Sequence, residues 1–158
     1  MAFDFNADEI FEMAEQMERN GAQFYRDAAE KVSDGKSKDL LLRLADMEVE
    51  HEQTFVEMRK YLSDQDKQSS VFDPEGETVK YLKALVDTRV FFKKKIDATS
   101  MKDIFKEALL AEKDAIVFYL GMKDLVPEER GKRHLENIIK EEMDHIRIIG
   151  RELSSAAS

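Results

Sequence analysis

The chain has no cysteine among its 158 residues, and it contains only two prolines and six glycines. Without cysteine it forms neither disulfides nor thiolate sites for zinc or iron, so any bound metal must be held by histidine and carboxylate side chains. The scarcity of proline and glycine leaves few breaks in regular structure. Because 37% of the residues are also charged, we predict an all-α protein built from long amphipathic helices.

Basic residues and long apolar runs are also scarce. The chain has 25 Lys and Arg against 34 Asp and Glu, which gives a formal net charge of −9. No basic stripe is present that could displace counterions from phosphates, which argues against a nucleic-acid partner. No stretch approaches the length of a membrane span, and the acidic first residues contain no apolar segment. We therefore expect a cytoplasmic protein that does not contact membranes.

Four stretches show apolar residues at the helical intervals of three and four. In the first half we predict helices at about 7–33 and 36–63, and the turn between them is so short that the helices must be antiparallel neighbours. In the second half we predict helices at about 101–125, after Ser100 as N-cap, and at about 128–153. The length of 158 residues is suitable for a single domain containing both helix pairs.

The segment between the two helix pairs, at about 64–100, is predicted to be one long crossover connection. Its first part is polar and contains Pro74 and Gly76, which interrupt the helical pattern. Apolar residues at helical spacing return at about 77–95, and this pattern predicts a short extra helix inside the crossover.

The second helix pair repeats the first at a constant offset of 94 residues. The aligned pairs are Ile10 and Ile104, Phe11 and Phe105, Ala14 and Ala108, Glu18 and Glu112, Phe24-Tyr25 and Phe118-Tyr119, Glu48 and Glu142, and His51 and His145. Each half thus has a helix with a central Glu, followed 30 residues later by the motif Glu-x-x-His. A Glu and a His three residues apart lie on one face of a helix, so both can turn towards the same metal.

The candidate metal ligands occupy the apolar rows of their helices, not the polar faces. In the first helix, Glu18 lies at the centre of the row Phe11, Ala14, Ala22, Tyr25, Ala29 and Val32. Four carboxylates in one dry interior would repel one another unless cations neutralised them, and two divalent ions would balance their charge. Ligation by many oxygens and one imidazole per ion favours iron or manganese over a structural zinc.

Over nearly its whole length, the chain resembles the rubrerythrin-type branch of the ferritin-like superfamily. The resemblance rests on Glu18, Glu48, His51, Glu112, Glu142 and His145. It implies a ferritin-like four-helix bundle in which these residues hold two iron ions, with Glu48 and Glu142 as bridges. It also implies that the hydroxyls of Tyr25 and Tyr119 orient ligand carboxylates, although ordinary core aromatics would give the same sequence pattern.

Two features of the chain differ from rubrerythrins. Those proteins carry a further carboxylate three residues beyond the ligand of the third helix, where this chain has Ala115, so peroxide-driven movement of iron is not expected. The cysteine-ligated rubredoxin domain is also missing, so turnover would need an external electron donor. From the habits of the family we expect a homodimer.

The leading functional hypothesis is an oxidoreductase whose two irons react with O2 or hydrogen peroxide as small-molecule oxidant. A ferroxidase or iron-handling protein, a dimanganese catalase-like protein and a metal-stabilised helical interaction module are the alternatives. The ligands alone do not distinguish iron from manganese. Outside the repeat, His134 is expected to be a surface or packing residue, and Glu50, Glu52 and Glu141 are expected on solvated faces.

Overall fold

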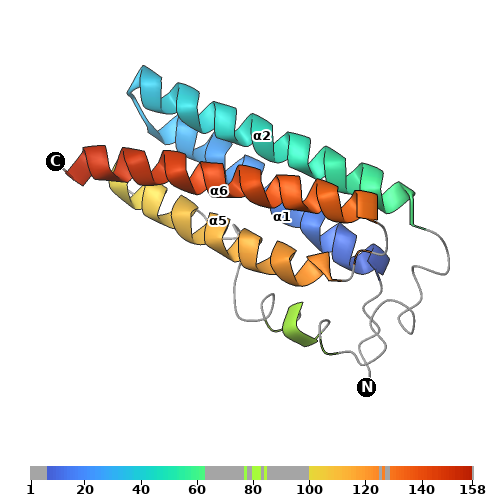
Figure 1. The fold of residues 1–158 in the computed structure, drawn as a ribbon. Helices are drawn as coiled ribbons and strands as arrows, with labels where there is room; N and C mark the ends of the chain where they lie inside the picture. The colour runs from blue at the N-terminus through green and yellow to red at the C-terminus, as the bar shows by residue number, and fades with distance from the viewer. Residues whose placement is uncertain are drawn as a thin grey trace.

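A computed structural model describes residues 7–62, 77, 80–82, 84, 100–124, 126 and 129–157 of the chain. Among these residues every regular element is a helix, which confirms the all-α prediction. The four long helices are α1 (Ala7–Lys31), α2 (Gly35–Lys60), α5 (Met101–Lys123) and α6 (Glu129–Ala157). They lie along a common direction and form a four-helix bundle (Figure 1).

The helices pair as two antiparallel hairpins, α1 with α2 and α5 with α6, and each pair packs along its length. Helix α1 also contacts α5, and α2 contacts α6, so the two hairpins close into one bundle. Figure 1 shows that α2 ends and α5 begins at opposite ends of the bundle. This arrangement agrees with the predicted long crossover, because the chain must return along the bundle before α5 starts.

Capping side chains explain where two of the helices begin. The carboxylate of Asp34 accepts hydrogen bonds from the backbone N and the hydroxyl of Ser37, at 3.0 and 2.8 Å, and starts α2 directly after the turn. The Ser100 hydroxyl accepts from the backbone N of Asp103 at 3.2 Å and starts α5, as predicted. The predicted end of the last helix was too early, because α6 continues to Ala157.

Apolar residues form two core clusters along the bundle. One lies towards the first turns of α1 and contains Phe11, Phe55, Tyr119 and Leu135 among its buried members. The other contains Tyr25, Leu41, Phe105 and Ile149. In each helix the candidate metal ligands lie in the sequence between the two clusters, so the bundle has a polar layer with apolar layers on both sides.

The described part of the crossover packs against α5. Leu82 is buried in the first core cluster, and the ring of Tyr81 lies so close to α5 that a Cβ on Gly121 would be 2.7 Å from its Cε1 atom. Glycine at position 121 therefore permits this close approach. Residues 77, 80–82 and 84 are helical, and the rest of the predicted helix at 77–95 lies outside the described residues.

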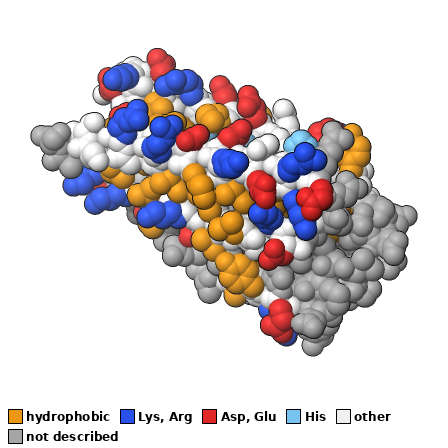
Figure 2. All heavy atoms as spheres, in the orientation of Figure 1, with side chains coloured by type: hydrophobic (Ala, Val, Ile, Leu, Met, Phe, Trp, Pro, Cys, Tyr) orange, Lys and Arg blue, Asp and Glu red, His pale blue; other side chains and the backbone are white. Residues whose placement is uncertain are grey.

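The surface is mainly charged, with an apolar area over α5 on the viewed face (Figure 2). The exposed large apolar side chains of the two helices are Leu110, Val117 and Leu120 of α5 and Met143 of α6. Within the described residues, none of the helices combines the length and apolar character that a bilayer crossing requires.

Candidate metal centre

The structure brings all six sequence-predicted ligands into the middle of the bundle. Each of the four helices contributes at its centre, because the residues continue the apolar rows that face the core. Their exposed fractions are 2% or less: Glu18, Glu48, His51, Glu112, Glu142 and His145. The buried rows predicted from the sequence are therefore correct around the site, and the ionisable residues are in the interior of the protein.

The six residues form two overlapping groups that could each hold a metal ion. One group is formed by Glu18, Glu48, His51 and Glu142, and the other by Glu48, Glu112, Glu142 and His145. In each group one ligand atom per residue lies within 4.8 Å of the others. Glu48 and Glu142 belong to both groups, which is the position that the family resemblance implies for bridging carboxylates.

Both histidines turn their Nδ1 atoms into the cluster. Nδ1 of His51 lies 3.1 Å from Oε1 of Glu142 and 3.5 Å from Oε2 of Glu18. Nδ1 of His145 lies 2.9 Å from Oε2 of Glu142, 3.1 Å from Oε1 of Glu48 and 3.3 Å from Oε1 of Glu112. The two rings are nearly parallel, with centroids 5.7 Å apart. One imidazole nitrogen is thus available in each group.

Two buried tyrosines hold carboxylates of the opposite hairpin. The hydroxyl of Tyr25 in α1 donates to Oε1 of Glu112 in α5 at 2.5 Å. The hydroxyl of Tyr119 in α5 donates to Oε1 of Glu18 in α1. Both tyrosines are fully buried, and burial together with these carboxylate charges raises their pKa values well above the usual range. The predicted orienting contacts exist, and each of them links the two halves of the chain.

The pKa values of the four carboxyls divide into two kinds. Burial and the charges of Glu142 and Glu18 raise the pKa of Glu48 well above its usual value, and burial and the charges of Glu112 and Glu18 do the same for Glu142. Burial also opposes ionisation of Glu18, but hydrogen bonds with Glu48 and His51 outweigh it and lower its pKa to about 2. Contacts with His145 and Glu142 likewise lower the pKa of Glu112.

The histidines are held in their charged form by the carboxylates around them. Burial alone would lower the pKa of His51, but its contacts with Glu142 and Glu18 raise it to about 12. Contacts with Glu112 and Glu142 raise the pKa of His145 to about 10 against the same effect of burial. Without metal, therefore, protons offset charge in the cluster: two imidazolium groups stand against the carboxylates of Glu18 and Glu112, and the raised pKa values of Glu48 and Glu142 favour their protonated forms.

The donor atoms fit two divalent cations. Among the described residues, three carboxylate oxygens of the cluster accept no hydrogen bond: Oε2 of Glu18, Oε1 of Glu48 and Oε2 of Glu142. Each lies 2.9–3.5 Å from a histidine Nδ1, so only charge attraction compensates for its burial. A cation would satisfy these oxygens as ligands. Two divalent ions would also replace the protons, because their four positive charges match the four carboxylates when both histidines are neutral.

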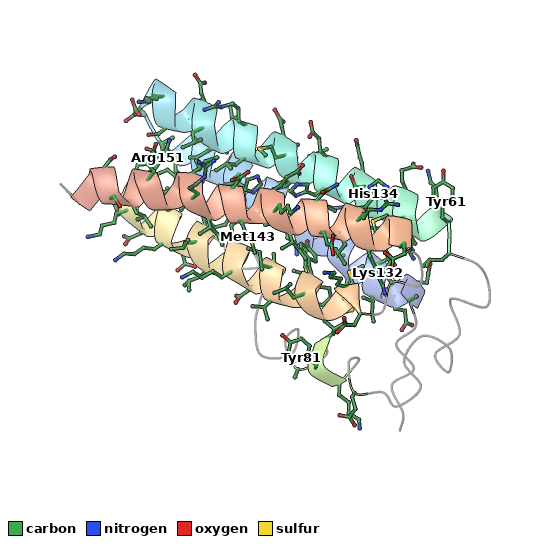
Figure 3. The ribbon with its side chains drawn as sticks, viewed as in Figure 1. Tyr61, Tyr81, Lys132, His134, Met143 and Arg151 are labelled. Carbon is green, nitrogen blue, oxygen red and sulfur yellow. The ribbon has the colours of Figure 1, made fainter. Side chains whose placement is uncertain are left out.

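One contact of the site was not predicted from the sequence. Nε2 of His51 lies 2.6 Å from Oε2 of Glu141, although the Glu141 side chain is 52% exposed. The expectation of a solvated Glu141 was therefore incomplete, since the residue also contacts a candidate ligand. Glu52 pairs with Arg19 at 2.7 Å. His134 is exposed on α6, near the bundle end where Tyr61 follows the last residue of α2 (Figure 3), and belongs to neither group.

Comparison with known proteins agrees with the geometry. The fold is similar to the crystal structure of a Thermotoga maritima protein that is provisionally described as a ferritin-like diiron-carboxylate protein. The TM-score is 0.73, the sequence identity is 23%, and the match covers 96% of each chain, which confirms the predicted ferritin-like bundle. No curated protein sequence shows significant similarity to the chain. The Rubrerythrin family model matches residues 9–153, across all four helices, and the chain therefore belongs to the rubrerythrin family.

Proposed function

We propose that the protein holds two iron ions in this cluster and acts as an oxidoreductase that reduces hydrogen peroxide or O2. The observation that carries the proposal is the pair of overlapping ligand groups that share Glu48 and Glu142. Two carboxylates that belong to both groups would hold two ions next to each other, whereas a single structural ion would need only one group. Membership of the rubrerythrin family supports the same interpretation.

The ligand types favour iron as the resident metal. Each group offers three carboxylates and one imidazole, and no thiolate exists anywhere in the chain. Imidazole and carboxylate ligands are suitable for Fe(II), whereas Mg²⁺ and Ca²⁺ prefer all-oxygen sites. Mn(II) uses the same ligands, so a dimanganese catalase-like protein is the principal alternative outcome of the metal analysis.

A pair of ferrous ions would supply the two electrons that, with two protons, convert one hydrogen peroxide molecule into two water molecules. The chain contributes the surroundings. The apolar clusters on both sides exclude water, and Tyr25 and Tyr119 fix the orientation of Glu112 and Glu18 through their hydroxyls. Because the chain has no cysteine-ligated iron, the electrons must return from an external donor.

Ala115 favours a resident cofactor over iron that passes through the protein. It is buried one helical turn after Glu112 and has no atom that could bind a metal. The cluster therefore has no additional carboxylate at this position that could take up a displaced ion. A ferroxidase or iron-handling role would instead require iron to leave the site readily after oxidation.

The first experiment measures metal content. The protein is expressed with iron and manganese available and purified without chelator, beside a Glu48→Ala/Glu142→Ala double variant. The matched control is Glu50→Ala/Asp144→Ala, which removes two exposed acidic residues from the same two helices. We expect about two irons per chain in the wild type and the control, and loss of both in the double variant.

Other results would redirect or reject the proposal. Two manganese ions per chain would favour catalase-like chemistry. A metal-free protein whose thermal stability does not change when iron is added would indicate a helical interaction module, because a bound ion stabilises the folded state. For the iron protein, rapid mixing with peroxide or O2 tests the reaction. Loss of iron during gel filtration after oxidation would indicate iron handling instead of a fixed cofactor.

A further inference from the structure

We propose that Glu141 is a positioning residue that makes the two metal positions unequal, so that the ion beside His51 is held more tightly than the ion beside His145. The inference rests on the proposed metal centre and adds to it a difference between its halves. It follows from the outer nitrogens of the two histidines, which have different surroundings.

The two histidines are equivalent in the sequence repeat and in the direction of their inner nitrogens. Both direct Nδ1 towards the cluster, where Glu142 lies 3.1 Å from His51 and 2.9 Å from His145. If Nδ1 binds the metal, it must be unprotonated, and the ring proton must be on Nε2. The group that accepts a hydrogen bond from Nε2 then fixes this tautomer and the ring orientation.

The outer nitrogens differ. Nε2 of His51 lies 2.6 Å from a carboxylate oxygen of Glu141. This oxygen can accept a short, charge-assisted hydrogen bond from a protonated Nε2. Nε2 of His145 is buried and has no hydrogen-bond partner among the residues that the structure describes. The outer nitrogen of one imidazole therefore contacts a carboxylate, and the outer nitrogen of the other faces only packed side chains.

The sequence repeat accounts for this difference. The position of the first half that corresponds to Glu141 is Met47, at the same offset of 94 residues that relates His51 to His145. A thioether is a weak acceptor and carries no charge, so it cannot replace a carboxylate. The two Glu-x-x-His motifs thus differ at the residue directly before the ligand Glu.

The contact has a known physical effect on metal binding. A carboxylate that accepts the outer N–H of a ligating histidine increases the basicity of the imidazole and keeps it in the binding orientation, and its removal weakens metal binding by about 10- to 100-fold. Glu141 can have this effect at low cost, because its half-exposed carboxylate remains hydrated. The buried ring of His145 receives no such support.

The test is a titration of the metal-free protein with Co(II), followed by absorption and calorimetry, on the full chain. We expect two binding steps of unequal affinity in the wild type. In Glu141→Ala the tighter step should weaken by about 10- to 100-fold, whereas Glu141→Gln, which keeps an acceptor oxygen, should lose less. Asp144→Ala is the matched control, since Asp144 is an exposed residue of the same helix and is not a predicted ligand. Its carboxylate lies 3.2 Å from the Arg147 guanidinium.

A double-mutant cycle assigns the effect to one histidine. The effect of Glu141→Ala should disappear when His51 is already replaced by Ala, and it should remain when His145 is replaced. Circular dichroism checks that each variant keeps its helical content. Equal losses in both backgrounds, or unchanged affinities in Glu141→Ala, would overturn the role of Glu141 and leave the metal centre standing. A wild-type protein that binds no Co(II) would overturn both.

Discussion

Binding of metal to the cluster should release protons, and the pKa values of the cluster residues limit how many. The perturbation is the addition of two divalent ions per chain to the metal-free protein at about pH 6. At this pH, His51 and His145 carry protons because their pKa values are raised to about 12 and about 10. Each must lose its Nδ1 proton to bind a metal, which accounts for two released protons.

The carboxyl groups of the cluster set the upper limit of the number of protons that metal binding releases. The pKa values of Glu48 and Glu142 are raised well above the usual range, so these groups add up to two further protons. Glu18, with a pKa of about 2, and Glu112, with a lowered pKa, are already ionised and add none. We therefore expect between two and four protons per pair of ions, and about four if both raised carboxyls are fully protonated.

The sign of the pH dependence follows from this count. Metal competes with protons, so the apparent affinity rises with pH as long as the metal-free cluster holds more protons than the loaded one. Release of two to four protons per two ions corresponds to a gain of about 10- to 100-fold in affinity per ion for each pH unit. Acidification should accordingly strip the metal from the protein.

Calorimetry in several buffers measures the proton count directly. The slope of the binding enthalpy against the ionisation enthalpy of the buffer gives the number of protons released. Asp144→Ala serves as control, because it removes an exposed carboxylate of the same helix that is not a predicted ligand and should leave the proton count unchanged. Release of fewer than two protons by the wild type would refute the reasoning, since it would show that the histidines are neutral in the metal-free protein.

Further predictions concern stability. Tyr119→Phe should destabilise the metal-free protein by about 1.5–3 kcal/mol in urea unfolding, because the buried Glu18 carboxylate loses a donor; an effect below about 0.5 kcal/mol would contradict this role. Gly150→Ala should stabilise by about 0.5–1 kcal/mol, since it lies inside α6 with no atom within 4 Å of the new Cβ. Gly131→Ala should instead destabilise, because its Cβ would be 2.6 Å from the buried Val126 and overpacking costs about 1–3 kcal/mol. Equal melting temperatures of the two glycine variants would contradict both. The expected homodimer remains a prediction, and sedimentation analysis tests it.

The rows of the four helices could be predicted because burial and periodicity act together. Residues at intervals of three and four in α1 are all buried: Phe11, Ala14, Glu18, Ala22, Tyr25 and Ala29. The negative charge of a Glu at the centre of such a row is costly to bury unless a metal ion or a proton neutralises it. Helical periodicity and the free-energy cost of burying charged side chains were therefore sufficient to predict the cluster from the sequence.

The remaining contacts depend on how the two hairpins face each other. Tyr25 shares a row with Glu18, yet its hydroxyl donates to Glu112 across the bundle, and no spacing within one helix contains that information. Glu141 was similarly assigned to solvent because it lies beside the core row, and only the packing of α2 against α6 places it at His51. The end of α6 was missed because its last residues are Ser and Ala, which lack the apolar periodicity used to detect helices.

Each ligand group combines three residues of one hairpin with one residue of the other. A bound ion would therefore join the two halves of the chain, as a disulfide does in proteins that contain cysteine. Closing a long loop restricts the unfolded chain and favours the folded state. For a protein without cysteine, the supply of metal would determine how firmly the two hairpins are joined, and loss of the metal would loosen the bundle.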